Sequence, residues 1–151
     1  MIYSKIKYGI LTYGLTTSSN LNKIQVIQNK LLKVISNQNY RTATNILHNS
    51  LGLLKVKDIL TQELLTFVHN FNKNKLPAVF KNYFTKFHNL HEINTRNQDK
   101  FIVPRFKTAF GSKVVKYLGA VTWNTLNQDI KIIHNVKSFR HKWKNTILPY
   151  Q

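Results

Sequence analysis

The chain has 151 residues, of which 42% are apolar and 12% aromatic, enough for one packed domain or two small subdomains that share a core. Lysine and arginine outnumber aspartate and glutamate by 23 to 5, a net charge of +18. Self-repulsion of that size weakens folding unless a polyanion binds. RNA, DNA or a hybrid duplex is therefore the expected partner, ahead of an acidic membrane surface.

The sequence lacks the residues for cysteine-based sites and the long apolar run of a membrane-spanning helix. There is no cysteine, which rules out disulfides and cysteine-based zinc sites. No apolar run approaches the roughly 20 residues that a membrane-spanning helix needs, so no membrane partner is expected.

The first third of the chain is predicted to be helical. Residues 2–14 are rich in apolar side chains and end at Gly14, and the TTSSN cluster at 16–20 supplies a helix N-cap. In the next helix Gln28 falls inside the apolar stripe, so its amide needs a buried partner. The stripe is formed by Leu21, Ile24, Ile27, Leu31, Leu32 and Ile35, with Lys23, Lys30 and Lys33 on the opposite face.

Three more helices are predicted before residue 88. They cover residues 41–51, closed by Gly52, then residues 55–73, and then residues 78–87, opened by Pro77. Glu63 lies towards the edge of the apolar face of the second of these. A carboxylate there is costly unless it is paired, so we expect a lysine or arginine partner.

After Phe87 the apolar residues no longer recur with the period of a helix. IVPRF at 102–106 could be an edge strand, because Pro104 cannot donate to a central ladder. Helical pattern returns at residues 112–126 and near the C-terminus. There, the apolar stripe consists of Val136, Phe139, Trp143 and Ile147.

The predicted fold class is therefore mainly α. A multi-helix bundle forms the first half, followed by an irregular segment, with a short β-hairpin as an option, and two C-terminal helices. The expected organisation is a helical subdomain at 1–87 with a basic subdomain at 88–151 packed on it; a single domain over 1–151 is the alternative.

No catalytic site, metal site or cofactor is predicted. Metal-dependent chemistry on nucleic acid needs clustered carboxylates, and no two acidic residues are one or two positions apart. His88 and His91 lack the His-Glu-x-x-His spacing of a helical zinc site. In Gly111-Ser112-Lys113 the serine precedes the lysine and no glycine lies five residues earlier, so the phosphate-loop pattern fails.

The predicted function is backbone-phosphate binding by basic side chains. Gly111 is expected to form a turn with positive φ, rimmed by lysines; a solvated lysine face is the alternative. Trp123 is expected to anchor the core and not to stack on a base. Arg96 could equally neutralise Glu63. The candidate contacts are Lys23, Lys30, Lys33, Arg96, Arg105, Lys107, Lys113, Lys116, Arg140 and Lys144.

A series of short motifs runs in order along nearly the whole chain: Tyr8-Gly9, Tyr13-Gly14, IQNKLLKVI at 27–35, LGLLKVKDI at 51–59 with Glu63 beyond, KLP at 75–77, HEINTR at 91–96, VPRFKTAFG at 103–111, VKYLGAVTWNTL at 115–126 and SFRHKWKNTIL at 138–148. In this order they resemble the region downstream of the reverse-transcriptase palm in LINE-type (non-LTR) retrotransposon polyproteins, especially the jockey and CR1-like groups. Tyr13 stands where that family often has Trp.

The resemblance implies a noncatalytic, thumb-and-beyond fragment of an RNA-directed DNA polymerase, located in the nucleus or the cytoplasm. Such a fragment would hold template and primer beside the palm of the parent polyprotein, and the divalent metal would belong to that palm. The palm's acidic motif, the endonuclease and a Cys/His knuckle do not occur in this sequence. The alternatives are an independent basic RNA-binding protein of ribosomal or organellar type, and a structural remnant with no activity.

Overall fold

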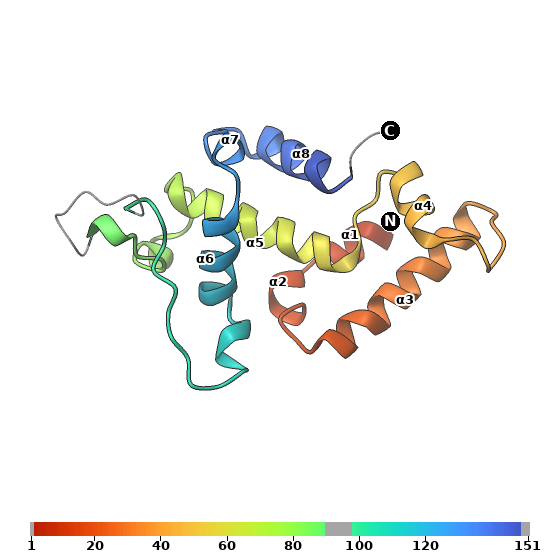
Figure 1. Ribbon diagram of the computed structural model, residues 1–151, viewed down its shortest axis with the longest axis horizontal. Helices are drawn as coiled ribbons and strands as arrows, with labels where there is room; N and C mark the ends of the chain where they lie inside the picture. Colours follow the sequence, from red (N-terminus) through yellow and green to blue (C-terminus); the bar gives the residue numbers. More distant parts are fainter. Residues whose placement is uncertain (1, 90–97, 149–151) are drawn as a thin grey trace. The chain divides into compact units, whose positions relative to one another are not determined.

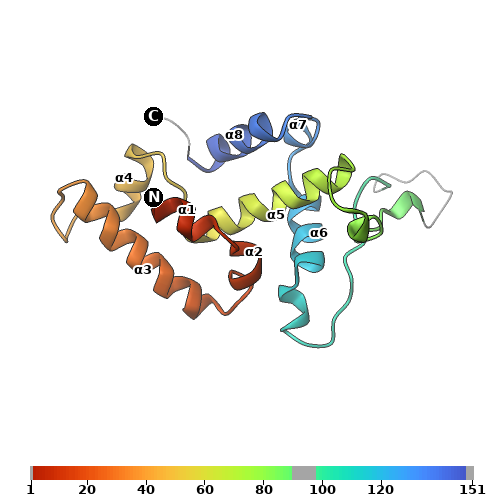
Figure 2. The same ribbon diagram turned by 180° about the vertical axis from the view of Figure 1, so that it is seen from behind.

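The computed structural model describes residues 2–89 and 98–148 and is mainly helical, which confirms the predicted fold class (Figures 1 and 2). The chain forms two compact units, Met1–Gln62 with His141–Gln151, and Glu63–Arg140. The boundary expected between residues 87 and 88 falls inside the second unit and stays a prediction.

Among its described residues, the first unit contains four helices and parts of two others. The complete helices are α1 (Ile2–Lys7), α2 (Ile10–Tyr13), α3 (Ser18–Ile35) and α4 (Thr44–Ser50). The unit also takes the first turns of α5 (Val56–Asn72) and the later part of α8 (Val136–Ile147). The segment 2–14 is two helices and not one, because Gly9 between them has φ 66°, a conformation that ends a right-handed helix.

Helix α3 packs against α4, and its inward face is more polar than expected. Leu32 is buried as predicted, but Ile27 and Ile35 are 57% and 64% exposed. Gln28 occupies the middle of the inward face, and its amide nitrogen donates to the carbonyl of Leu54 at 2.9 Å. The expected partner of Gln28 is therefore confirmed, while the placement of Ile27 and Ile35 in the buried stripe is wrong.

Two predicted helix ends in this unit are confirmed. Helix α4 is followed by Gly52 with φ 58°, the left-handed conformation in which glycine carries no Cβ penalty. Helix α3 begins after Thr17, inside the predicted cap cluster. The Thr17 hydroxyl, however, pairs with that of Ser19 at 3.0 Å and makes no cap bond to the backbone.

The second unit is built around the later part of α5. It contains α6 (Val115–Thr125), α7 (Gln128–Lys131), the start of α8, and the 3₁₀ turns η1 (Ala78–Phe80), η2 (Phe87–Asn89) and η3 (Gly111–Lys113). Its buried apolar side chains are Leu64, Leu65, Val68, Phe84, Phe101, Ala120, Trp123, Ile130 and Phe139. The predicted helical pattern at 112–126 is confirmed by η3 and α6.

The helix predicted at 78–87 is wrong: a single 3₁₀ turn follows Pro77, and the chain then bends. The aromatic side chains of this segment pack on α5 and are not arranged as one face of a helix. The rings of Phe80, Tyr83 and Phe84 lie edge-on around Phe67, with centroids 5.3, 5.8 and 6.2 Å away. Aromatic residues are weak helix formers, so ring contacts decide the path of this segment.

The optional β-hairpin is not seen either. Among the described residues the only pairing of this kind is one isolated antiparallel bridge between Lys86 and Phe101. The side chain of Asn124 accepts from the Phe101 N–H at 2.9 Å and donates to its carbonyl at 2.8 Å. Phe101 thus has its backbone groups satisfied by a side-chain amide, and Pro104 offers no N–H for a ladder.

Gly119 lets α6 approach α5 closely, as both ribbon views show (Figures 1 and 2). A Cβ at Gly119 would lie 3.0 Å from Phe84 Cζ and 3.1 Å from Val68 Cγ2. We expect Gly119→Val to lower the free energy of unfolding by about 1–3 kcal/mol through overpacking. Gly119→Ala, the matched control, should cost less, since one methyl needs a small shift and the helix gains up to ~1 kcal/mol of propensity. Urea denaturation measures both, and equal stabilities for the two variants would contradict the close approach.

Candidate nucleic-acid interface

The predicted basic residues fall into both compact units, so each group is described by itself. Lys23, Lys30 and Lys33 lie on α3 and Lys144 lies on α8, in the first unit. Arg105, Lys107, Lys113, Lys116 and Arg140 belong to the second unit. Arg96 lies outside the described residues, as do Glu92 and the rest of HEINTR.

The solvent face of α3 carries lysines interleaved with apolar side chains. Lys23 and Lys30 are exposed, as the helical spacing predicts. Val26, Ile27 and Val34 share their side of the helix and are 51%, 57% and 77% exposed. This face therefore offers positive charge and apolar surface together.

The loop after α3 adds an exposed aromatic residue and an arginine that the sequence analysis missed. The ammonium group of Lys33 donates to the carbonyl of Tyr40, which ties this lysine to the loop. Tyr40 is 73% exposed, and Arg41 lies over its ring with Cζ 5.4 Å from the centroid while Nε donates to the hydroxyl at 2.9 Å. The adjacent Tyr-Arg pair after a basic helix was the available signal.

The ammonium group of Lys144 lies close to Gly52. It is half-buried on α8, and its Nζ lies 3.6 Å from the position that a Cβ would take at Gly52. Gly52 follows the C-terminus of α4, where the helix dipole favours a cation.

Around Gly111 the structure corrects one expectation. The described glycines with positive φ are Gly9 and Gly52, so Gly111 does not form the expected left-handed turn. It begins η3, and a Cβ there would lie 2.6 Å from Phe106, so a glycine is needed to seat that ring. Arg105 and Lys107 next to Phe106 are exposed, in an irregular segment.

Lys113 and Lys116 are more enclosed than Arg105 and Lys107. Both are half-buried, on η3 and at the start of α6. The Nζ of Lys116 lies 5.9 Å from the centroid of the Tyr83 ring, within the range of a cation–π contact.

Arg140 has a structural role. It forms an ion pair with Glu63, and the two side chains are 24% and 17% exposed. The expectation that Glu63 has a basic partner is confirmed by its pairing with Arg140. A partly enclosed arginine that neutralises a carboxylate is a weaker candidate for phosphate contact than exposed Arg105.

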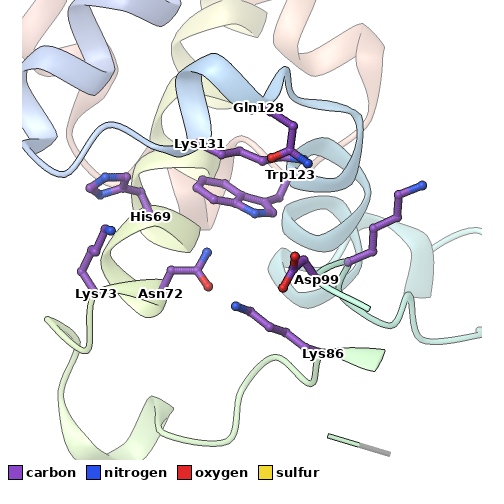
Figure 3. A pocket seen from close by; sticks show the side chains of 9 residues that line it. His69, Asn72, Lys73, Lys86, Asp99, Trp123, Gln128 and Lys131 are labelled. Atoms are coloured by element: carbon purple, nitrogen blue, oxygen red, sulfur yellow. The ribbon is translucent and has the colours of Figure 1, made fainter. Parts of the chain in front are cut away.

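A cavity of about 300 Å³ in the second unit brings together basic residues that the sequence analysis did not single out (Figure 3). Lys73 directly follows α5, and Lys131 is the last residue of α7. Lys86 forms the bridge to Phe101, and Lys100 precedes Phe101. No local sequence pattern links these positions, because Lys86 and Lys100 are 14 residues apart and reach the same cavity through the Lys86–Phe101 bridge.

Burial and neighbouring charges both change the pKa of Lys131, which lines this cavity. Burial lowers the pKa of Lys131, and the nearby Lys100 lowers it further, while Asp99 acts in the opposite direction. The Nζ of Lys73 lies 2.9 Å from Nδ1 of His134.

Within residues 2–89 and 98–148 no three histidine, aspartate or glutamate side chains cluster as a metal site would require. In the same residues no helix has the length and apolarity needed to cross a bilayer.

Trp123 is a core residue, as expected. It is 6% exposed, and its ring stacks on Phe139 with a centroid distance of 6.0 Å and an interplanar angle of 27°.

Comparison with known protein families, curated proteins and solved structures finds no match for this chain.

Proposed function

We propose that the chain is the noncatalytic, C-terminal nucleic-acid-binding part of a non-LTR retrotransposon reverse transcriptase. The observation that carries the binding function is the charge of +18 together with exposed basic side chains in each unit, Lys23 and Lys30 in one and Arg105 and Lys107 in the other. The ordered motifs of the sequence support the assignment to this family.

The mechanism is contact with backbone phosphate. Each lysine that neutralises a phosphate releases condensed counterions, so the affinity falls steeply as salt rises and depends little on base sequence. The exposed Tyr40, held by Arg41, adds a surface on which an unpaired base can stack. Such stacking would favour single-stranded template or primer ends.

The mixed face of α3 supports a protein partner as well. The exposed Val26, Ile27 and Val34 lie beside the lysines, and a neighbouring domain of a polyprotein, such as the palm, would cover them. The catalytic carboxylates and their metal ions would come from that palm.

The lysine face of α3 gives a quantitative test. The double variant Lys23→Gln/Lys30→Gln should lower affinity for an unstructured RNA about 5- to 30-fold at ~0.15 M salt. It should also reduce the slope of log K against log salt by about 1.4, close to 0.7 for each lost contact with a single strand. Fluorescence anisotropy over a salt series measures both quantities.

The control is Lys55→Gln/Lys57→Gln, which removes the same charge from exposed positions of the same unit. It should leave the slope close to that of the parent. If both pairs reduce affinity and slope equally, only the total charge matters and α3 is not the interface.

The family assignment is tested by translating the DNA upstream of the codon for Met1. A Tyr/Phe-x-Asp-Asp motif in a nearby frame is the expected result. An unrelated upstream gene with a separate promoter would contradict the retrotransposon assignment and favour an independent basic RNA-binding protein.

A further inference from the structure

The cavity of the second unit has the charge of an anion site. Four lysines line it: Lys73 directly after α5, Lys86 and Lys100 at the Lys86–Phe101 bridge, and Lys131 in α7. Among the described lining residues Asp99 contributes the single carboxylate. All of these residues lie within Glu63–Arg140. A cavity with three more ammonium groups than carboxylates repels cations and attracts a multiply charged anion.

Trp123 supplies a donor at the same place. Its side chain is 6% exposed, and the indole Nε1–H is not among the buried atoms that lack a partner, so it is open to the cavity. In Figure 3 the indole nitrogen faces the space towards which the ends of Asn72, Lys86 and Asp99 point. An indole N–H can only donate, so an anionic oxygen that enters the cavity is a matching acceptor for it.

We propose that this cavity binds a phosphate monoester, carried either by a free nucleotide or by the terminal phosphate of a nucleic-acid strand. The dianion would accept from the Trp123 N–H and from the ammonium groups of Lys86 and Lys131. The Asn72 amide adds a further donor at the cavity wall. The volume of about 300 Å³ lies at the small end of ligand pockets and suits one nucleotide unit.

The electrostatics of Lys131 agree with an anionic occupant. Without a ligand, burial and the charge of Lys100 both lower the pKa of Lys131. A bound dianion offsets both effects, since it supplies an opposite charge in the same cavity. Asp99 is exposed and acts in the same direction with only one charge.

This site is separate from the basic residues proposed to track a strand. It recognises one terminal phosphate, whereas Lys23, Lys30, Arg105 and Lys107 would contact internal phosphates. A mononucleotide therefore tests the cavity by itself, and a long 5′-hydroxyl RNA tests the proposed function by itself.

The indole N–H groups of the full chain provide the direct measurement. The sequence has two tryptophans, so the ¹⁵N-correlated spectrum has two indole signals, and Trp123→Phe assigns them. Titration with AMP should shift the Trp123 signal to saturation and leave the Trp143 signal in place. Adenosine, or sodium chloride at matched ionic strength, should not reproduce the shift; if chloride does, or if AMP causes none up to about 10 mM, the site is refuted.

Charge variants provide the second measurement. Lys86→Gln and Lys131→Gln should each weaken AMP binding about 5- to 10-fold, the cost of one charge-assisted hydrogen bond. Lys137→Gln is the matched control, an exposed lysine of the same unit away from the cavity, and should change it less than about 2-fold. Equal losses in all three variants would overturn the proposal.

The source of the phosphate is decided with oligonucleotides. A short 5′-phosphorylated RNA that binds more tightly than its 5′-hydroxyl form, with the difference abolished by Lys86→Gln, assigns the site to strand ends. Saturable AMP binding with no difference between the two RNAs assigns it to free nucleotides. Absence of both effects rejects the site while leaving the salt-dependent RNA binding of the proposed function untouched.

Discussion

Replacing Phe101 with alanine is expected to lower the free energy of unfolding by about 3–5 kcal/mol. Phe101 has no exposed surface, and its ring lies 5.1 Å from that of Phe84 and 5.9 Å from that of Phe71, centroid to centroid. Truncation removes these contacts and leaves a cavity that the surroundings fill only in part. Small domains have only about 5–15 kcal/mol of stability, so a large part of it depends on this side chain.

The Phe101→Ala substitution should also weaken AMP binding at the proposed phosphate site. Lys100 precedes Phe101, and Lys86 is bridged to it, so the position of both lysines depends on the Phe101 ring being seated. Chemical denaturation and AMP titration of the same variant measure the two effects. Phe110→Ala, at a ring that is 77% exposed, is the control and should change stability by less than about 0.5 kcal/mol. If the two variants were equally stable, Phe101 would not be a core residue.

Lowering the pH below about 6.5 is expected to destabilise the fold, mainly through His69. His69 has no exposed surface, and its Nε2 lies 2.7 Å from the carbonyl oxygen of Ile133, to which it donates. Its Nδ1 is buried and has no hydrogen-bond partner among the described residues. Burial therefore lowers the pKa of His69, outweighing the bond to Ile133.

His48 acts in the same direction. It is 1% exposed, and burial lowers its pKa more than the hydrogen bond to the Leu53 carbonyl raises it. A histidine with a lowered pKa stays neutral in the folded state while the unfolded chain takes up a proton below about pH 6.5. Stability is thus complete above that pH and is lost as the pH falls towards the folded-state pKa, by at most about 1.4 kcal/mol per pH unit for each histidine.

The measurement is urea denaturation at intervals between about pH 7.5 and pH 5, above the ordinary range of carboxyl groups. Burial raises the pKa of Asp58, so that carboxyl works against the trend and does not produce it. His69→Gln should flatten the pH dependence, and His141→Gln at an exposed position of α8 controls for the loss of an imidazole. A pH profile that is flat in the parent protein would contradict the assignment.

The candidate site could be predicted only where one helix carries it. Lys23 and Lys30 lie at helical spacing on one side of α3, and both are exposed, as that spacing predicts. The cavity lysines could not be predicted, because Lys86 and Lys100 are distant in sequence and reach the same cavity through the bridge between Lys86 and Phe101. Tyr40 and Arg41 were visible as a pair, but only the structure shows the tyrosine exposed and the arginine over its ring.

By itself, the sequence determined the helical class, the ends of α4 to within a few residues, the need of Gln28 for a buried partner, and the buried place of Trp123. These features follow from local periodicity, helix-ending residues and the cost of an unpaired polar group, all of which act over a few residues. The tertiary structure decided the path after Pro77, the role of Gly111 and the partner of Glu63. Each of these depends on a side chain far away in the sequence or on ring packing, which outweighs local preference because buried contacts are worth more than propensity differences.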